Sequence, residues 1–204
     1  MSKTGVTTNP RVVDRHGRHL WTLESLPTTY SPDFRSKDCE APVFTGYPNA
    51  TFRRCRKCNA CRSAQKRYWY VRATKEASAW PRTWFVTLTF SQLSDTSYQV
   101  VQKWLKRTRQ RLNRMDSTPF GASHFSYLCV YERGKKRGRP HYHLLVHCQN
   151  KVTRRSLEDT WKDGFSKCSL ARPSHTKYVV KYIGKELEHG TRIRASRQYG
   201  KYPF

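Results

Sequence analysis

Two apolar runs joined by a short basic loop limit the fold of this chain more than any other feature. Residues 124–132 ("HFSYLCVYE") and 140–147 ("PHYHLLVH") are rich in aromatic and aliphatic side chains, and the loop "RGKKRGR" between them contains two glycines. This pattern predicts two antiparallel strands joined as a hairpin. Because successive side chains of a strand point to opposite faces, His141 and His143 share one face. Such a pair can present two metal ligands, although an isolated His-x-His is more often an ordinary surface or core pair.

Regular patterns also run through the rest of the chain from residue 63 onward. Apolar residues recur at helical spacing up to residue 115, and Asp95 or Thr96 is placed to cap that helix. The other elements that we expect are a helix over 63–79, a buried strand over 83–90 ("TWFVTLTF"), a short helix over 157–161, a strand over 165–170 and a helix over 174–187. This order predicts an α+β fold, in which helices pack on an antiparallel sheet.

Composition divides the chain into four segments. Residues 1–50 form a poorly patterned N-terminal arm that prolines interrupt. Residues 51–80 combine a basic C-x2-C-x2-C sequence with the first expected helix. Residues 81–190 hold the α+β domain, and residues 191–204 form a basic C-terminal tail. A length of 204 residues suits one ordinary domain with an appendage.

The charge of the chain indicates a polyanionic partner. Lys and Arg number 40 against 14 Asp and Glu, which gives a formal net charge of +26, and residues 41–75 contain no acid. Basic clusters interleaved with rings, as in "KRYWYVR", suit single-stranded DNA, because unpaired bases stack on rings while phosphates meet cations. The same rings fit the packed face of a helix equally well. The candidate DNA-binding residues are Arg62, Lys66, Arg67, Lys135, Lys136, Arg137 and Arg139.

The cysteines suggest a metal rather than disulfides. No apolar run approaches the about 20 residues of a membrane span, and the N-terminus lacks a hydrophobic signal segment. We therefore expect no membrane partner and a location in the reducing cytoplasm, where disulfides are rare. Cys55, Cys58 and Cys61 are spaced as metal ligands, and Cys39 is the nearest upstream candidate for a fourth. Structural Zn²⁺, an iron–sulfur cluster and unmetallated thiols are the alternatives at this cluster.

The expected hairpin also offers a second metal site. Glu132 ends its first strand, so antiparallel pairing would bring this carboxylate near His141 and His143. Two imidazoles and one carboxylate with open positions suit Mn²⁺ or Mg²⁺ better than a closed structural zinc site. The alternative for Glu132 is a salt bridge to the arginines of the loop.

The last expected helix, "KYVVKYIGK", repeats Tyr-x-x-Lys. At about 100° per residue, Tyr178, Tyr182 and Lys185 fall on one stripe, and Lys181 lies to the side of Tyr178. The opposite stripe is apolar and should pack on the sheet; it comprises Val179, Val180, Ile183 and Leu187. Two tyrosines four residues apart are often only part of an amphipathic helix, but here both phenols would share the domain with the His-x-His strand.

These sequences, in this order, resemble a known family. "FVTLTF", "RPHYHLLV" and "KYVVKYIGK" are similar to the three motifs of the HUH rolling-circle replication initiators, and the doubled Tyr-x-x-Lys is similar to the two-tyrosine branch. The upstream "CRKCNACR" with its basic helix resembles the replication initiators of gokushovirus-like microviruses. The resemblance covers about residues 53–200, and the order of motifs is distinctive, because relaxases of the same superfamily place the tyrosine before the histidines.

The resemblance implies an HUH endonuclease-like fold for residues 81–190 and a function in DNA replication. Glu132, His141 and His143 would hold Mg²⁺ or Mn²⁺, and Tyr178 and Tyr182 would be the nucleophiles, assisted by Lys181 and Lys185. A tyrosine, with Tyr182 expected to cut first, would nick a single-stranded origin and leave a 5′-phosphotyrosine and a free 3′-OH. The implied partners are a host helicase and polymerase in a bacterial cytoplasm. The alternatives are a non-catalytic single-stranded DNA-binding or packaging protein and an HUH transposase.

Overall fold

A five-stranded antiparallel sheet with the strand order β6-β3-β5-β4-β7 lies at the centre of the molecule. In the computed structural model, which describes residues 39–45, 51–91, 94–115, 125–134, 138–149, 152–186 and 193–201, its strands are β3 (Arg82–Phe90), β4 (Phe125–Arg133), β5 (Pro140–Cys148), β6 (Gly164–Leu170) and β7 (Arg194–Ala195). A separate two-stranded ribbon consists of β1 (Val43–Thr45) and β2 (Thr51–Arg53). The expected hairpin is confirmed as β4 and β5.

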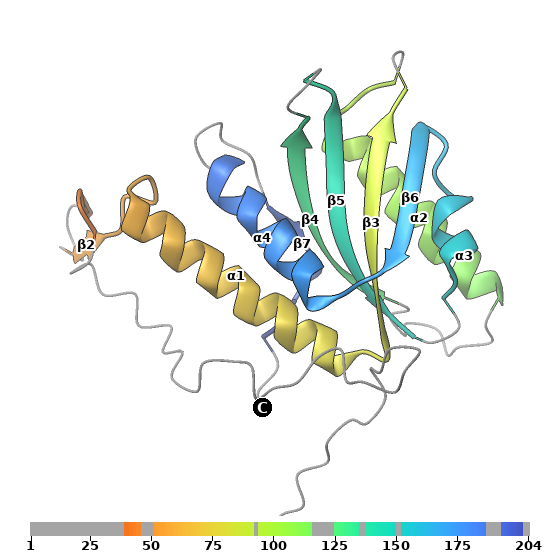
Figure 1. Ribbon diagram of the computed structural model, residues 1–204, viewed down its shortest axis with the longest axis horizontal. Helices are drawn as coiled ribbons and strands as arrows, with labels where there is room; N and C mark the ends of the chain where they lie inside the picture. Colours follow the sequence, from red (N-terminus) through yellow and green to blue (C-terminus); the bar gives the residue numbers. More distant parts are fainter. Residues whose placement is uncertain are drawn as a thin grey trace, which may run out of the picture.

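Helices cover both faces of the sheet (Figure 1). The helices α1 (Asn59–Ala79) and α4 (Pro173–Glu186) lie side by side on one face, which we call the α4 face. The helices α2 (Tyr98–Met115) and α3 (Arg154–Glu158) lie on the other, the α2 face. The predicted α+β class, an antiparallel sheet with helices packed on it, is therefore confirmed.

Strand alternation divides the interior into two cores. In β3, Val86, Leu88 and Phe90 pack toward the α2 face, where Trp104 of α2 is fully buried. Phe85 points to the α4 face, where Val179 and Ile183 of α4 are buried. Because α4 takes its apolar stripe to the sheet as the sequence predicted, its other stripe is left to carry polar groups. Leu187, the last residue expected on the apolar stripe, lies outside the described residues.

Three helix starts differ from the sequence expectation. The helix α1 begins at Asn59, earlier than residue 63, because the Cys58 side chain caps it by accepting from the Cys61 backbone N–H. The helix α3 begins at Arg154, because Thr153 and Ser156 form a capping box ahead of the expected start at residue 157. The helix α2 begins at Tyr98, after Asp95 has accepted a hydrogen bond from the Ser97 backbone N–H.

The C-terminal residues add structure that the sequence analysis missed. The strand β7 pairs with β4, and Tyr199 is fully buried beside α1. The Arg72 guanidinium donates to the Tyr199 carbonyl oxygen, and the Gly200 backbone N–H donates to Glu76. Gly200 has φ of +57°, and a Cβ there would overlap the Arg72 backbone, so only glycine fits this approach. Part of the expected basic tail thus belongs to the core, while the four segment boundaries stay a proposal.

Candidate active site

Glu132 and the two histidines expected as ligands converge on the α4 face. Glu132 of β4 lies opposite His141 of β5 in the ladder, as the hairpin predicted. Its carboxylate, however, is bonded to the next histidine on that face: His143 Nε2 and Glu132 Oε2 lie 2.6 Å apart. Both residues are buried, with 6% exposure for His143 and 8% for Glu132. His141 is less buried, and its Nε2 faces Gly134, where a Cβ would lie only 3.1 Å away.

Both tyrosines of α4 lie against this carboxylate and imidazole. The Tyr182 ring stacks on His143 with centroids 5.8 Å apart, and Tyr178 meets the same imidazole edge-on at 5.4 Å. The Tyr182 hydroxyl donates to the Tyr178 hydroxyl over 3.1 Å and is also hydrogen-bonded to Glu132. Tyr178 is 39% exposed, whereas Tyr182 is half-buried. One phenol is therefore open to a substrate, and the other contacts the ligand candidates.

Burial affects the proton affinity of these groups. It raises the pKa of the Tyr182 hydroxyl, and the hydrogen bonds to Tyr178 and Glu132 raise it further. Burial lowers the pKa of His143, against an opposing effect of the Glu132 hydrogen bond. The neutral phenol and the neutral imidazole are therefore the favoured forms near pH 7.

Four residues of this site were not singled out from the sequence. The Phe85 ring lies between two imidazoles, stacked on His143 at 5.7 Å and on His175 at 4.7 Å between centroids. Thr87 and Thr89 of β3 contact the ring nitrogens of His143 and His141. The period-two alternation of "FVTLTF" could have placed Phe85, Thr87 and Thr89 on one face, but not opposite the histidines, because the register between β3 and β5 is not visible in the sequence.

The remaining expected site residues are more scattered. Lys181 is exposed on α4, and Lys185 lies in α4 with a side chain outside the described ones. Lys66 and Arg67 lie on α1 with Arg62, and Arg139 is exposed at the start of the second hairpin strand. Lys135, Lys136 and Arg137 lie outside the described residues.

The four cysteines form a compact group at the N-terminus of α1. The sulfurs of Cys39, Cys55, Cys58 and Cys61 lie within 4.8 Å of one another, and among the described His, Cys, Asp and Glu residues this is the group of three or more that is gathered so closely. Glu132, His141 and His143 are not gathered to that degree. The ribbon of β1 and β2 connects Cys39 to Cys55, which explains how a cysteine outside the C-x2-C-x2-C spacing reaches the cluster. The group can hold a metal ion.

The distances within the cluster match those of a tetrahedral thiolate site. The Sγ atoms of Cys61 lie 3.5 Å from Cys39 and 3.9 Å from Cys55. Two sulfurs on one zinc at about 2.3 Å lie about 3.8 Å apart in tetrahedral geometry. Arg56 has φ of +63°, and this turn lets the backbone N–H groups of Lys57 and Cys58 donate to Cys55 Sγ.

Backbone N–H groups stabilise two of the thiolates. Hydrogen bonds from Cys58 and Lys57 lower the pKa of the Cys55 thiol to about 6. A hydrogen bond from the Cys61 backbone lowers the pKa of Cys58, whereas burial raises that of Cys61 to about 12. Cys55 is therefore mostly thiolate at neutral pH, which is the form that binds a metal.

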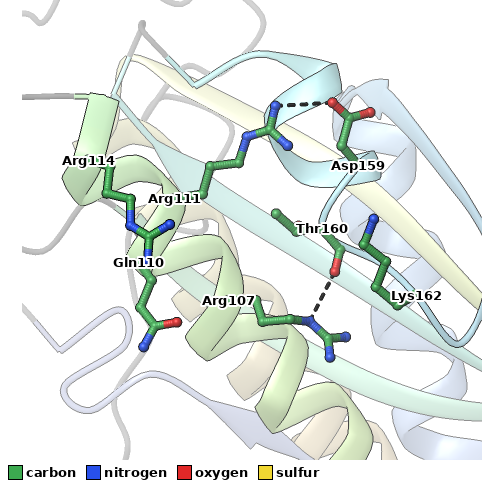
Figure 2. A pocket seen from close by; sticks show the side chains of 7 residues that line it. All are labelled: Arg107, Gln110, Arg111, Arg114, Asp159, Thr160 and Lys162. Atoms are coloured by element: carbon green, nitrogen blue, oxygen red, sulfur yellow. Dashed lines mark hydrogen bonds and ion pairs between the residues drawn. The ribbon is translucent and has the colours of Figure 1, made fainter.

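A basic hollow lies on the opposite face of the sheet, between α2 and the residues after α3. Its volume is about 460 Å³, and Figure 2 shows the side chains that line it. Arg107 donates to the Thr160 carbonyl oxygen and pairs with Asp163 at 3.0 Å, and Arg111 pairs with Asp159 at 3.1 Å. The complete lining is Arg107, Gln110, Arg111, Arg114, Asp159, Thr160 and Lys162.

Comparison with known proteins identifies relatives of this domain. The family model for replication-associated proteins of the ORF2 type matches residues 83–187, more than half of the chain, from β3 to the end of α4. The replication-associated protein VP4 of Bdellovibrio phage phiMH2K is 28% identical over 155 residues, which cover 67% of this chain and 49% of the relative. The replication-associated protein ORF2 of Spiroplasma virus 4 is 28% identical over 158 residues, with 65% and 48% covered. The replication-associated protein ORF4 of Chlamydia phage 1 is 25% identical over 166 residues, with 70% and 40% covered.

The chain thus spans about half the length of the curated relatives it matches. No solved structure matches it significantly. Within the part of the chain that the structure describes, no helix combines the length and apolar character needed to cross a membrane.

Proposed function

The chain belongs to the family of ORF2-type replication-associated proteins, and from this premise we propose that it initiates phage DNA replication as a tyrosine endonuclease. It would nick one strand of a single-stranded origin inside the bacterial host and begin rolling-circle synthesis. The observation that carries the proposal is the meeting of two α4 phenols with His143 and Glu132 on one face of the sheet. A protein that only binds DNA has no need of this arrangement.

Glu132, His141 and His143 would hold Mg²⁺ or Mn²⁺. The donor set fits, because a buried carboxylate and two imidazoles share one sheet face, and their nearest donor atoms already lie 2.6 Å apart. A bound cation supplies Lewis-acid polarisation of the scissile phosphate. Glu132 and the neutral His143 meet the requirement that ligands be deprotonated.

The tyrosine supplies the covalent step. The phenol oxygen attacks the phosphorus, an O–P bond to tyrosine forms, and the bond from phosphorus to the 3′ oxygen breaks. The phenol loses its proton and the leaving 3′ oxygen gains one, so the products are a 5′-phosphotyrosine and a 3′-OH. Glu132, hydrogen-bonded to Tyr182, is the group placed to receive the phenol proton. A host polymerase would extend the 3′-OH, and a host helicase would unwind the duplex.

Two tyrosines allow strand transfer at one site. Tyr178 and Tyr182 are one helical turn apart, and their hydroxyls are in hydrogen-bonding contact at 3.1 Å. One can hold the 5′ end while the other cuts the regenerated origin, because the energy of the broken bond is kept in the adduct. Tyr182 contacts both Glu132 and His143, which supports it as the first nucleophile. Lys181 and Lys185 of the same helix would stabilise a phenolate.

The substrate strand would be bound by charge and stacking on the α4 face. Basic residues of α1 and of the hairpin loop would contact phosphates: Arg62, Lys66, Arg67, Lys135, Lys136, Arg137 and Arg139. The exposed ring of Tyr178 is open to a base or sugar of the bound strand. This binding would weaken steeply as salt rises.

The cysteine cluster would bind one structural Zn²⁺. Protein purified without chelator should contain one zinc per chain, and Cys58→Ser should release it, because the cluster then loses a thiolate and the cap of α1. Elemental analysis measures the metal, and circular dichroism measures the loss of helix near α1.

Cys168→Ser is the matched control, because Cys168 is equally buried but lies in β6, outside the cluster. It should retain the zinc. Native protein free of zinc would remove this assignment, and so would a Cys58→Ser variant that keeps one zinc per chain.

A denaturing gel separates the proposed function from its rivals. Single-stranded origin DNA with Mn²⁺ should give a protein-linked 5′ fragment and a second fragment with an extendable 3′-OH. A binding or packaging protein would shift native gels without any adduct, and a transposase would require its own element ends rather than a replication origin.

A further inference from the structure

Every histidine of β5 has a threonine of β3 as its cross-strand partner. Within the ladder, His141 pairs with Thr89, His143 with Thr87 and His147 with Thr83. In each pair the threonine Oγ1 contacts the imidazole Nδ1, at 3.1, 3.1 and 2.9 Å. The other ring nitrogen, Nε2, is therefore left for a second partner.

A hydroxyl suits an imidazole that must change its tautomer. In the present structure His143 Nε2 contacts Glu132, so Nε2 carries the proton and Nδ1 accepts from the Thr87 hydroxyl. A metal bound at Nε2 needs the lone pair there, which moves the proton to Nδ1. Threonine serves both forms, because its hydroxyl donates to a bare Nδ1 and accepts from a protonated one. A carbonyl or carboxylate partner would serve only the second.

We propose that Thr87 and Thr89 are positioning residues that let His143 and His141 exchange tautomers when a divalent cation binds. This inference rests on the proposed function, because it assumes the cation site at Glu132, His141 and His143. The two threonines would hold the imidazole planes and lower the cost of loading the site, without touching the DNA or the metal themselves.

The third pair provides a natural comparison. Thr83 contacts His147 in the same way, but His147 Nε2 is bonded to the buried Tyr199 hydroxyl at 2.7 Å. Burial lowers the pKa of His147 to about 3, so it is a neutral core residue with both nitrogens engaged. The same cross-strand contact therefore occurs with and without a free site at Nε2.

The test compares threonine variants by metal binding and by the tautomer of the ring. Thr87→Val and Thr89→Val keep the shape of the side chain but remove the hydroxyl, and each should weaken Mn²⁺ binding by about 10- to 100-fold. Thr87→Ser and Thr89→Ser restore a hydroxyl and should recover most of the affinity. Nitrogen NMR of the imidazoles should show that Mg²⁺ moves the His143 proton from Nε2 to Nδ1 in the native chain, but only incompletely in Thr87→Val.

Thr83→Val is the matched control and should retain native Mn²⁺ affinity, although it is destabilised like the other valine variants. Equal affinity in the native chain and in both site valine variants would overturn the inference while leaving the metal assignment intact. A native chain whose His141 and His143 signals do not respond to Mg²⁺ or Mn²⁺ would overturn the metal assignment itself, and this inference with it.

A separate observation concerns the basic hollow on the α2 face. The helix α2 carries six basic residues and no acid, and Arg107, Arg111 and Arg114 occur once per turn along the edge of the hollow (Figure 2). Hydrogen bonds and ion pairs hold the first two guanidinium groups in place. Arg114 and Lys162 are exposed and have no ion-pair partner among the residues that the structure describes.

We infer that this hollow binds phosphates of a second nucleic-acid segment. Fixed guanidinium groups one helical turn apart, about 5.4 Å, can contact successive phosphates of a backbone. The α4 face carries the tyrosines, so a strand in the hollow lies across the sheet from the cut. The segment bound here would be DNA flanking the nicked strand, which gives the protein contacts outside its cleavage site.

Arg114→Gln with Lys162→Gln tests this without breaking the paired arginines. On a long DNA strand the slope of log affinity against log salt should fall by about 1.4 for two lost phosphate contacts. Lys103→Gln with Lys106→Gln removes the same charge from α2 outside the hollow and should change the slope less. A strand too short to reach the hollow should be nicked at the native rate. An unchanged slope, as expected for a hollow that binds an acidic protein, would overturn the inference, and so would equal losses in the two double variants.

Discussion

Replacing Glu132 by glutamine should lower the rate of single-strand nicking by more than about 100-fold, since even the outer partners of metal ligands contribute 10- to 100-fold. Glutamine keeps the shape of the side chain and an oxygen for His143 Nε2, but it removes the charge that would bind the cation and receive the phenol proton. Folding and DNA affinity should stay close to native. Initial nicking rates in Mn²⁺, thermal unfolding and filter binding measure the three quantities.

Glu158→Gln is the matched control, because this half-buried carboxylate lies on the α2 face and accepts from the Cys168 backbone N–H. It should nick at the native rate. The double variant His141→Ala with His143→Ala should be inactive as well, though less stable by about 1–3 kcal/mol, because it leaves the buried Glu132 carboxylate without a donor. Nicking at the native rate by either site variant in Mn²⁺ would contradict the metal assignment.

The double variant Tyr178→Phe with Tyr182→Phe should bind DNA normally and form no covalent adduct, a loss of at least about 10³-fold, since removing a covalent nucleophile costs that much or more. Phenylalanine keeps the ring contacts with His143, so the fold should not change. Tyr131→Phe, on the other face of the same sheet, is the matched control and should behave as the native chain.

Each single variant should retain part of the activity. Tyr182→Phe should slow the first cut, because Tyr182 is the tyrosine that contacts Glu132. Tyr178→Phe should cut once but fail to release circles repeatedly, because no second phenol takes over the strand. An adduct that persists in the double variant would move the nucleophile elsewhere. Transfer between the tyrosines would be excluded if either single variant completed repeated rounds as well as the native chain.

The parts of the site that the sequence predicted depend on local patterns. A short loop between two strands brings Glu132 opposite His141. Helical spacing sends Val179 and Ile183 to the sheet and leaves Tyr178 and Tyr182 on the other stripe. These are short-range relations, in which one element or one hairpin decides which side chains share a face.

The parts that the sequence did not predict depend on distant pairing. Thr87 and Thr89 meet the histidines because β3 pairs with β5, although α2 and β4 separate the two strands along the chain. The strand β7 is two residues long and has no periodicity of its own, so only its pairing with β4 defines it. Cys39 could be proposed as a ligand only as the nearest upstream cysteine, since the ribbon that brings it to the cluster is also short.

The central claim, that a tyrosine of α4 attacks the origin strand, is tested most directly by locating the adduct. The native chain is incubated with single-stranded origin DNA and Mn²⁺, digested with nuclease and protease, and analysed by mass spectrometry. We expect a nucleotide on the peptide that contains Tyr178 and Tyr182, with Tyr182 as the first residue modified. A nucleotide linked to any other residue, or cleavage that leaves no protein-linked 5′ phosphate, would contradict the account.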